Sequence, residues 1–278
     1  MTRTLAVAAA VAAACTLSAS ASPEAPIVLH GSRARPLVAL TFDADMTGAM
    51  REALRSGRVA RWYDPAILAE LRATHTPATI FVTGLWAETY PRIARSLAHD
   101  PLFELENHSY DHAGWEQPCY GLPSVPTQEQ KREEVHRGAV ALAAVTGRSA
   151  AFFRFPGGCE SGRDVRLVEE LGEQPVQWDV ISGDSYLRDP AQVVRQVLTQ
   201  VRPGSIVILH LVGAPNAPST AAAVRELIPR LRARGLRFVK LRTLLTGPRA
   251  PRVAGGRTHP LAAHAPKGET APRTRGSG

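Results

Sequence analysis

The chain has 278 residues, of which 44% are hydrophobic, and it carries a formal net charge of +8 at neutral pH. This length and apolar content suit one large domain with a buried core. Residues 247–278 hold six Lys or Arg against one acid, so much of the charge lies there and nothing in the rest of the chain indicates binding to nucleic acid.

Residues 1–25 are typical of a secretory signal peptide. A basic residue precedes an unbroken run of small apolar residues from Leu5 to Cys15, and Ala19-Ser20-Ala21 offers a cleavage site. The run is too short to cross a membrane, so we expect no transmembrane span. We expect a secreted or cell-wall-associated protein. A lipoprotein anchored through Cys15 is less favoured, because Ala12 stands three residues earlier, where a larger aliphatic is usual.

Residues 247–278 are dense in Pro, Gly and Thr and show no apolar periodicity, which predicts a disordered basic tail. The tail is either simply solvated or an electrostatic tether to an anionic cell-wall polymer. The folded domain is therefore expected to span residues 26–246.

Within that domain, short β-rich apolar runs alternate with helical patterns. Strands are expected at residues 37–42, 78–82, 103–105, 151–155, 176–178, 205–209 and 237–241. Helices with start signals are expected at residues 66–74, 128–145, 191–201 and 220–234, preceded by Asp64-Pro65, Thr127, Asp189-Pro190 and Ser219. This alternation predicts an α/β fold, a distorted and incomplete (β/α) barrel with about seven parallel strands.

Polar residues follow several of these runs. They are Asp43, Asp45, His108, His112, Arg154, Asp179 and His210. A βα-repeat protein places its chemistry at the carboxyl ends of its strands, where loops converge. The pattern therefore predicts an active site assembled from distant segments.

His108 and His112 are four residues apart, so their imidazoles can bind one cation if the segment is helical or tightly looped. Asp43 and Asp45 would repel each other unless a cation or Arg balances them or one takes up a proton. The useful division is one carboxylate on a metal ion and the other as a base beside it.

His210 ends the sixth run, where it is placed to act as a proton donor. Arg154 follows an aromatic strand, and a buried Arg needs a carboxylate partner. Asp43, Asp179 or Asp184 would serve.

Five ordered motifs resemble those of the polysaccharide deacetylases of carbohydrate esterase family four. They are Thr41-Phe42-Asp43-Ala44-Asp45, His108-Ser109-x-x-His112, Arg154-x-Pro156-Gly157-Gly158, Trp178-Asp179 and Leu209-His210. The resemblance implies a distorted barrel that removes acetyl groups from N-acetylated sugars, or sometimes from acetylated xylan. It also implies a divalent metal held by an Asp and two His, with zinc favoured and cobalt or another divalent ion as alternatives.

Carried over by residue, the resemblance makes Asp43 the base, His108 and His112 metal ligands, and His210 the general acid. Arg154 would orient the acids. The same motifs place Pro156, Gly157, Gly158 and Trp178 at the substrate, which would be an acetylated polysaccharide or oligosaccharide of the cell wall or of chitin type.

The chain departs from the family pattern at Ala44, where a second aspartate usually binds the metal. Asp45 is the obvious substitute, since a one-residue slip in a loop moves a carboxylate by no more than about 3.8 Å of chain. The roles of Asp43 and Asp45 could also be exchanged.

Other departures are Glu106, where glycine is common, and the long stretch of residues 46–63 before the next helix. The fourth motif is loose, so Asp179 and Asp184 both stay open as the partner of His210 or Arg154. Two other functions also stay open: an O-acetyl xylan-type esterase, and a glycan-binding barrel that has lost catalysis.

Cys119 and Cys159 are the cysteines outside the expected signal, and each follows a motif loop. An exported protein meets an oxidising environment, so we expect a disulfide between them that fastens the two loops. The alternative is two free buried thiols.

Overall fold

The computed structural model describes residues 26–246 and 253–254. The expected signal peptide lies outside the described residues, and so does the expected tail except for Val253–Ala254. That dipeptide forms β10 and pairs antiparallel with β1 (Pro26–Ile27). Within the described ranges, no helix is long and apolar enough to span a membrane.

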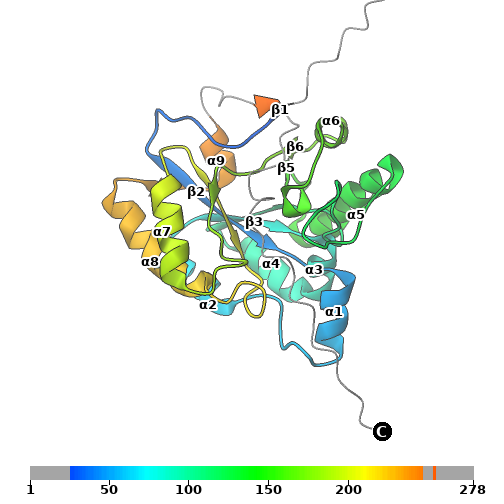
Figure 1. Ribbon diagram of the computed structural model, residues 1–278, viewed down its shortest axis with the longest axis horizontal. Helices are drawn as coiled ribbons and strands as arrows, with labels where there is room; N and C mark the ends of the chain where they lie inside the picture. Colours follow the sequence, from blue (N-terminus) through cyan, green and yellow to red (C-terminus); the bar gives the residue numbers. More distant parts are fainter. Residues whose placement is uncertain (1–25, 247–252, 255–278) are drawn as a thin grey trace, which may run out of the picture.

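The centre of the fold is a curled parallel sheet (Figure 1). Its strands are β2 (Leu37–Ala44), β3 (Ala78–Val82), β4 (Phe103–Asn107), β5 (Phe152–Phe153), β6 (Gln174–Pro175), β7 (Val180–Ile181) and β8 (Ile206–His210). They follow the order β6-β5-β4-β3-β2-β8-β7, and β9 (Arg237–Phe238) pairs with the start of β2. The α/β fold with an incompletely closed parallel barrel is therefore confirmed.

Helices cover the outside of this sheet. They are α1 (Gly48–Arg55), α2 (Pro65–Ala73), α3 (Gly84–Thr89), α4 (Pro91–His99), α5 (Gln128–Thr146), α6 (Gly162–Glu170), α7 (Pro190–Gln200) and α8 (Thr220–Ala233). The short helix α9 (Leu241–Leu245) instead packs Leu241 and Leu244 against the core inside the barrel, and a 3-10 turn, η1 (Pro156–Gly158), follows β5. In Figure 1, α2, α7 and α8 flank one side of β2, and α3, α4 and α5 flank the other.

The four predicted helices are present as α2, α5, α7 and α8. Asp64, Thr127 and Asp189 each cap a helix by accepting a hydrogen bond from a backbone N–H of its first turn, which satisfies an otherwise unpaired donor. The other helices, α1, α3, α4, α6 and α9, were not predicted. α1 lies inside the unusual stretch of residues 46–63 and has eight residues, none of them fully buried. Met50, Ala53 and Leu54 are spaced as on one helical face and pack partly buried against the core, but this pattern covers too short a window to indicate a helix by itself.

Side chains alternate along β2 between two environments. Leu40, Phe42 and Ala44 belong to the large core under the helices. Leu37 and Ala39 point the other way, into the smaller core inside the barrel, which also contains Ile206 and Ile208 of β8. Every residue of β2 is buried, as expected for a strand covered on both faces.

Three predicted strands are shorter than expected, for local reasons. The predicted strand 151–155 is reduced to Phe152–Phe153. At its start the buried Glu106 carboxylate accepts the N–H groups of Ala151 and Phe152 (2.7 and 3.0 Å), and at its end Phe155 is already the N-cap of η1. In place of 176–178, β6 lies at Gln174–Pro175. Val176 still donates its N–H to the Phe153 carbonyl at 2.8 Å, and beyond that it forms an isolated bridge to Val28. β9 stops at Phe238, because α9 starts at Leu241.

Candidate metal and active site

Asp45, His108 and His112 form a compact cluster at the carboxyl ends of the strands. One ligand atom from each lies within 4.8 Å of the others, and Asp45 Oδ1 is 3.4 Å from the Nε2 atoms of both histidines. Asp45 Oδ1 and His108 Nε2 are buried without a hydrogen-bond partner. Buried polar atoms are rarely left unpaired, and one carboxylate with two imidazoles is a familiar ligand set for zinc-like ions.

The alternation of β2 explains how Asp45 reaches this position. The strand continues through Ala44, so residues 43 and 45 point to one face and Ala44 to the other, where it packs in the outer core. We expected a one-residue slip in a loop to bring the Asp45 carboxylate to the metal position, and this explanation is wrong. Asp45 lies beside Asp43 because the side-chain period of a strand is two.

His108 and His112 converge through a tight loop and not through a helix. Ser109 and His112 have positive φ angles of 66° and 62°, and Glu134 Oε2 on α5 accepts the N–H groups of Tyr110 and Asp111 (3.0 and 3.2 Å). Glu134 was not predicted, since Glu133-Glu134 looks like an ordinary polar pair on a helix. The buried carboxylate holds the backbone that presents both imidazoles.

The protonation of the cluster suits a cation. Burial lowers the pKa of His112 to about 4 despite the opposing effect of Asp45, so this imidazole is neutral at pH 7. Burial alone would raise the pKa of Asp45, but His112 and His108 hold it well below its ordinary value. His108 Nδ1 is 2.8 Å from the carbonyl oxygen of Arg154, to which it can donate, leaving Nε2 as the ligand atom.

Asp43 lies next to the cluster and pairs with a buried arginine. Arg154 Nη1 donates to Asp43 Oδ1 at 2.7 Å, and Nη2 donates to the Gln177 carbonyl at 3.3 Å. The guanidinium also lies over the Phe81 ring, 4.0 Å from its centroid. Asp43 Oδ2 is 3.6 Å from His108 Nε2, so one carboxylate oxygen is held by Arg154 and the other faces the cluster.

His210 stands opposite Asp43 in the β2–β8 ladder, with Asp184 behind it. Asp184 Oδ1 lies 2.8 Å from His210 Nδ1, while Oδ2 accepts from the His210 backbone N–H and from Thr220 Oγ1. Burial alone would lower the pKa of His210, but Asp184 raises it to about 10. His210 is therefore protonated at neutral pH, with Nε2 left for the cavity.

Asp179 does not belong to the site, although it was expected as a possible supporting residue. It accepts hydrogen bonds from Arg33, Ser205 Oγ and the Ile206 N–H (2.7, 2.9 and 2.8 Å). Ser205 and Ile206 lie at the start of β8, whereas His210 ends the strand. Of the two open candidates, Asp184 pairs with His210, and Asp43 is the partner of Arg154.

A cavity of about 540 Å³ opens over these groups. Of the residues expected at the substrate, Gly157 and Trp178 line it. Pro156 and Gly158 lie behind the wall, where a Cβ on Gly158 would be 2.9 Å from the Trp178 ring. The other lining residues that were not predicted include Tyr120, Leu122, Tyr186, Arg188 and Asn216. They lie in loops without periodicity, so only their closeness to motif residues could have indicated them.

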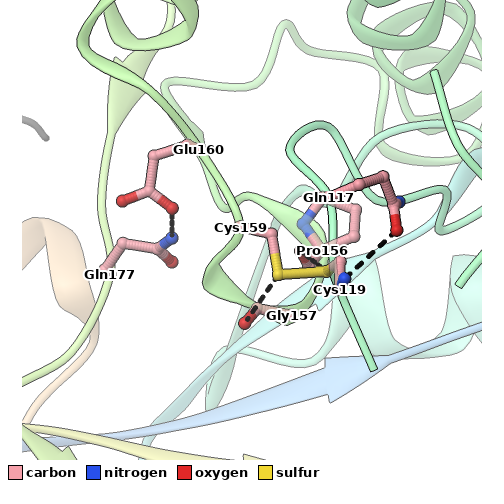
Figure 2. Close-up of a disulfide and its surroundings, with 7 residues drawn as sticks. All are labelled: Gln117, Cys119, Pro156, Gly157, Cys159, Glu160 and Gln177. Carbon is pink, nitrogen blue, oxygen red and sulfur yellow. Dashed lines mark hydrogen bonds between the residues drawn. A yellow bond between two sulfur atoms is a disulfide. The ribbon is translucent and has the colours of Figure 1, made fainter. Parts of the chain in front are cut away.

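The predicted disulfide between Cys119 and Cys159 is confirmed (Figure 2). It joins two loops whose cysteines are 40 residues apart in sequence, with a Cα–Cα distance of 6.0 Å. Figure 2 shows the bond beside Pro156 and Gly157, in the loop that follows Arg154. The disulfide therefore fastens residues 113–125 to one wall of the cavity.

The polysaccharide deacetylase family model matches residues 30–176, more than half of the chain. The chain thus belongs to the polysaccharide deacetylases, carbohydrate esterase family four. A chitooligosaccharide deacetylase from Azorhizobium caulinodans is 29% identical over 182 residues, covering 62% of this chain and 82% of the relative. A peptidoglycan-N-acetylglucosamine deacetylase from Bacillus cereus is 26% identical over 179 residues, covering 64% and 62%.

Solved structures show the same fold. A family 4 acetyl xylan esterase from Clostridium thermocellum, in complex with a cobalt ion, has a TM-score of 0.60 at 25% identity and covers 76% of this chain and 90% of its own. A family pseudoenzyme from Bacillus anthracis has a TM-score of 0.66 at 22% identity, covering 82% and 72%. The second likeness concerns the fold alone.

Proposed function

We propose that this protein hydrolyses the acetamide of N-acetylated glycans, releasing acetate and a free amine. The observation that carries the proposal is the arrangement of three units around one cavity: the cluster of Asp45, His108 and His112, the Asp43–Arg154 pair and the His210–Asp184 pair. The relatives named for chitooligosaccharide and peptidoglycan substrates support the N-acetylated class.

Asp45, His108 and His112 would hold the divalent ion, for which we propose zinc. The unpaired buried atoms Asp45 Oδ1 and His108 Nε2 fit such an ion. When bound, a divalent cation supplies Lewis-acid polarisation of the acetyl carbonyl and lowers the pKa of water. The structure in complex with cobalt indicates that a relative accepts that ion.

The two flanking pairs divide the proton transfers. Arg154 holds Asp43 Oδ1, so Oδ2 is free to accept a proton from the water that attacks the acetyl carbon. The C–N bond then breaks, and the leaving nitrogen takes a proton from His210. Asp184 keeps that imidazole charged and oriented through its Nδ1 atom. Both transfers occur between groups that converge on the same cavity.

Ala44 does not by itself indicate a lost activity. The side chain at position 44 faces the outer core, and Asp45 supplies a carboxylate to the cluster on the opposite face. An O-acetyl esterase remains the second candidate, because a relative of known structure is an acetyl xylan esterase. Such an enzyme needs His210 less, since an alkoxide is a better leaving group than an amide nitrogen.

Acetate release distinguishes these functions. Chelated protein is assayed on tetra-N-acetylchitotetraose, peptidoglycan and acetylated xylan, alone and after addition of zinc or cobalt. We expect metal-dependent release from an N-acetylated substrate and little from xylan. The reverse preference would establish the esterase. Glycan binding without any release, in protein shown to contain metal, would establish a binding barrel.

We also propose that the protein acts outside the cytoplasm, either secreted or associated with the cell wall. The signal-like residues 1–25 and the disulfide support an oxidising compartment. The expected tail could tether the domain to anionic wall polymers. Fractionation with N-terminal sequencing tests the location, and full-length protein starting at Met1 in the cytosol would contradict it.

A further inference from the structure

Tyr120 is unusually exposed for a large side chain. Its exposed fraction is 49%, and among the described residues the other large exposed hydrophobic side chain is Val140 of α5, at 56%. Tyr120 lines the same cavity as Asp43 and His210, whereas Val140 does not. Asp43 and Asp45 are buried at the base of this cavity, so the tyrosine belongs to its outer part.

The local backbone and the disulfide hold Tyr120 in this position. Tyr120 has a φ of 49°, in the left-handed region, a conformation that costs free energy for a residue with a bulky side chain. Its neighbour Cys119 is bonded to Cys159. The disulfide thus constrains the backbone on the N-terminal side of the ring.

Gly157 makes room for this arrangement. A Cβ built on Gly157 would lie 2.9 Å from Cys119 Sγ and 3.2 Å from Tyr120 Cδ2. The tyrosine ring and the disulfide therefore pack against the glycine backbone of the loop that follows Arg154. Any larger residue there would displace one of them, and Gly157 also has a positive φ of 64°.

The surroundings of Tyr120 suit the flat apolar side of a sugar. Leu122, Trp178, Tyr186 and Ile208 line the same cavity. Tyr186 is itself anchored, because its hydroxyl accepts a hydrogen bond from Gln196 at 3.1 Å. An aromatic ring offers a large apolar surface. Because a tyrosine side chain has two rotatable χ angles, it loses little conformational entropy on binding.

We propose that Tyr120 is a glycan-contacting residue, and that the Cys119–Cys159 disulfide positions its ring to stack on a pyranose unit next to the one that is deacetylated. This inference rests on the proposed function. It adds that the protein binds a second sugar of an oligomeric substrate through Tyr120. The contact is the same in ground state and transition state, so it lowers KM for oligomers without changing kcat.

Kinetics of three variants test the contact. The probes are N-acetylglucosamine and tetra-N-acetylchitotetraose, and the variants are Tyr120→Ala, Tyr120→Phe and the control Val140→Ala. We expect Tyr120→Ala to raise KM for the tetramer about 5- to 10-fold with kcat retained, an effect equivalent to about 1 to 1.4 kcal/mol. The monomer should be unaffected, Tyr120→Phe should resemble wild type, and so should Val140→Ala. An unchanged tetramer KM in Tyr120→Ala would overturn the proposal, as would an equal loss on monomer and tetramer.

The role of the disulfide is tested by a double-mutant cycle. Cys119→Ser with Cys159→Ser should raise the tetramer KM in the wild-type background and add nothing further in the Tyr120→Ala background. If that variant does not fold, mild reduction of folded wild-type and Tyr120→Ala protein gives the same comparison. Equal KM increases in both backgrounds would show that the disulfide acts independently of Tyr120.

Calorimetric binding of the tetramer to metal-free protein separates this inference from the proposed function. Wild type that binds the tetramer more tightly than Tyr120→Ala does, yet releases no acetate with metal added, would leave the contact established and the activity refuted. Acetate release from the tetramer together with equal affinity of the two proteins would establish the activity and refute the contact. Failure of wild type to bind the tetramer at all would also overturn the contact.

Discussion

Asp43 and Asp45 share one face of β2 but have different surroundings. Asp43 has one oxygen held by Arg154, whereas Asp45 Oδ1 is buried without a hydrogen-bond partner between two imidazoles. A carboxylate oxygen without a donor suits a cation, and one oriented by an arginine suits proton transfer. The two aspartates should therefore respond differently to substitution, Asp45 through metal binding and Asp43 through proton transfer.

Asp45→Ala should lose bound metal and activity together, and excess zinc should restore part of the rate. Asp43→Asn should keep the metal and lose about 10² to 10⁴ in rate, because an amide cannot accept the proton. Metal content and acetate release are measured on both variants. Loss of metal in Asp43→Asn with retention in Asp45→Ala would reverse the roles, and retention in both would leave the ion to His108, His112 and another acid.

Asp184→Asn should shift the pH dependence of kcat. In the folded protein Asp184 raises the pKa of His210 from its ordinary value of 6.5 to about 10. Without that carboxylate, His210 loses its proton at lower pH, so the alkaline limb of the kcat profile should move toward neutrality. Asp179→Asn removes the same charge at the start of β8 and should leave the alkaline limb in place.

The same pair contributes to stability in a defined pH window. Because the folded pKa of His210 is raised, its contribution is complete below pH 6.5 and is lost as the pH rises toward about 10. The pKa of Asp184 is lowered, so its contribution is present above 3.8 and is lost as the pH falls through the folded pKa. Urea unfolding of Asp184→Asn should therefore show the largest loss of unfolding free energy between about pH 3.8 and 6.5. A loss at pH 10 as large as the loss in that window would contradict the pairing.

At the scale of elements, the site depends on where strands end and on what fixes the loops after them. Asp43 and His210 are register partners of β2 and β8. Glu134 of α5 holds the loop after β4 by two backbone hydrogen bonds. The buried Glu134 carboxylate thus accepts backbone N–H groups that a neighbouring strand would accept in a regular sheet.

The start of α2 provides a test of local sequence signals. Asp64 accepts the Ala66 N–H at 2.9 Å, so Asp64→Ala should lower the free energy of unfolding by about 1 kcal/mol. Pro65→Ala should cost less, because the proline mainly presets the backbone. Thermal and urea denaturation measure both. A large loss of activity in Asp64→Ala with unchanged stability would instead give Asp64 a role in the site, a role that its absence from the cavity lining argues against.

At the scale of the whole molecule, the disulfide is the one covalent link between distant loops among the described residues. Closing a separation of 40 residues should stabilise the folded state by roughly 3 to 4 kcal/mol in the chain-entropy model. Cys119→Ser with Cys159→Ser should therefore lower the melting temperature by about 10 °C. Thiol titration of the denatured, unreduced domain should find no free cysteine. Two free thiols, or an unchanged melting temperature, would contradict this.

Local patterns were enough to predict much of this protein. Helix caps depend on residues that are neighbours in the sequence, so they can be recognised from the sequence alone. This holds for the caps at Asp64, Thr127 and Asp189 and for the helices that follow them. The motif residues Asp43, Asp45, His108, His112, Arg154 and His210 were also found in sequence, and the structure brings all six to one end of the barrel.

Only the tertiary structure decided which of these residues meet. Asp179 and Asp184 are both acids that follow a short β-rich segment, and the choice between them rests on contacts to Ser205 and Thr220 far along the chain. Tyr120 gains its place from a disulfide and from the backbone of Gly157. Residue type and periodicity are local properties, so they determine the elements and the available chemistry. Partner choice depends on strand register and loop closure over long separations, and these exist only in the folded chain.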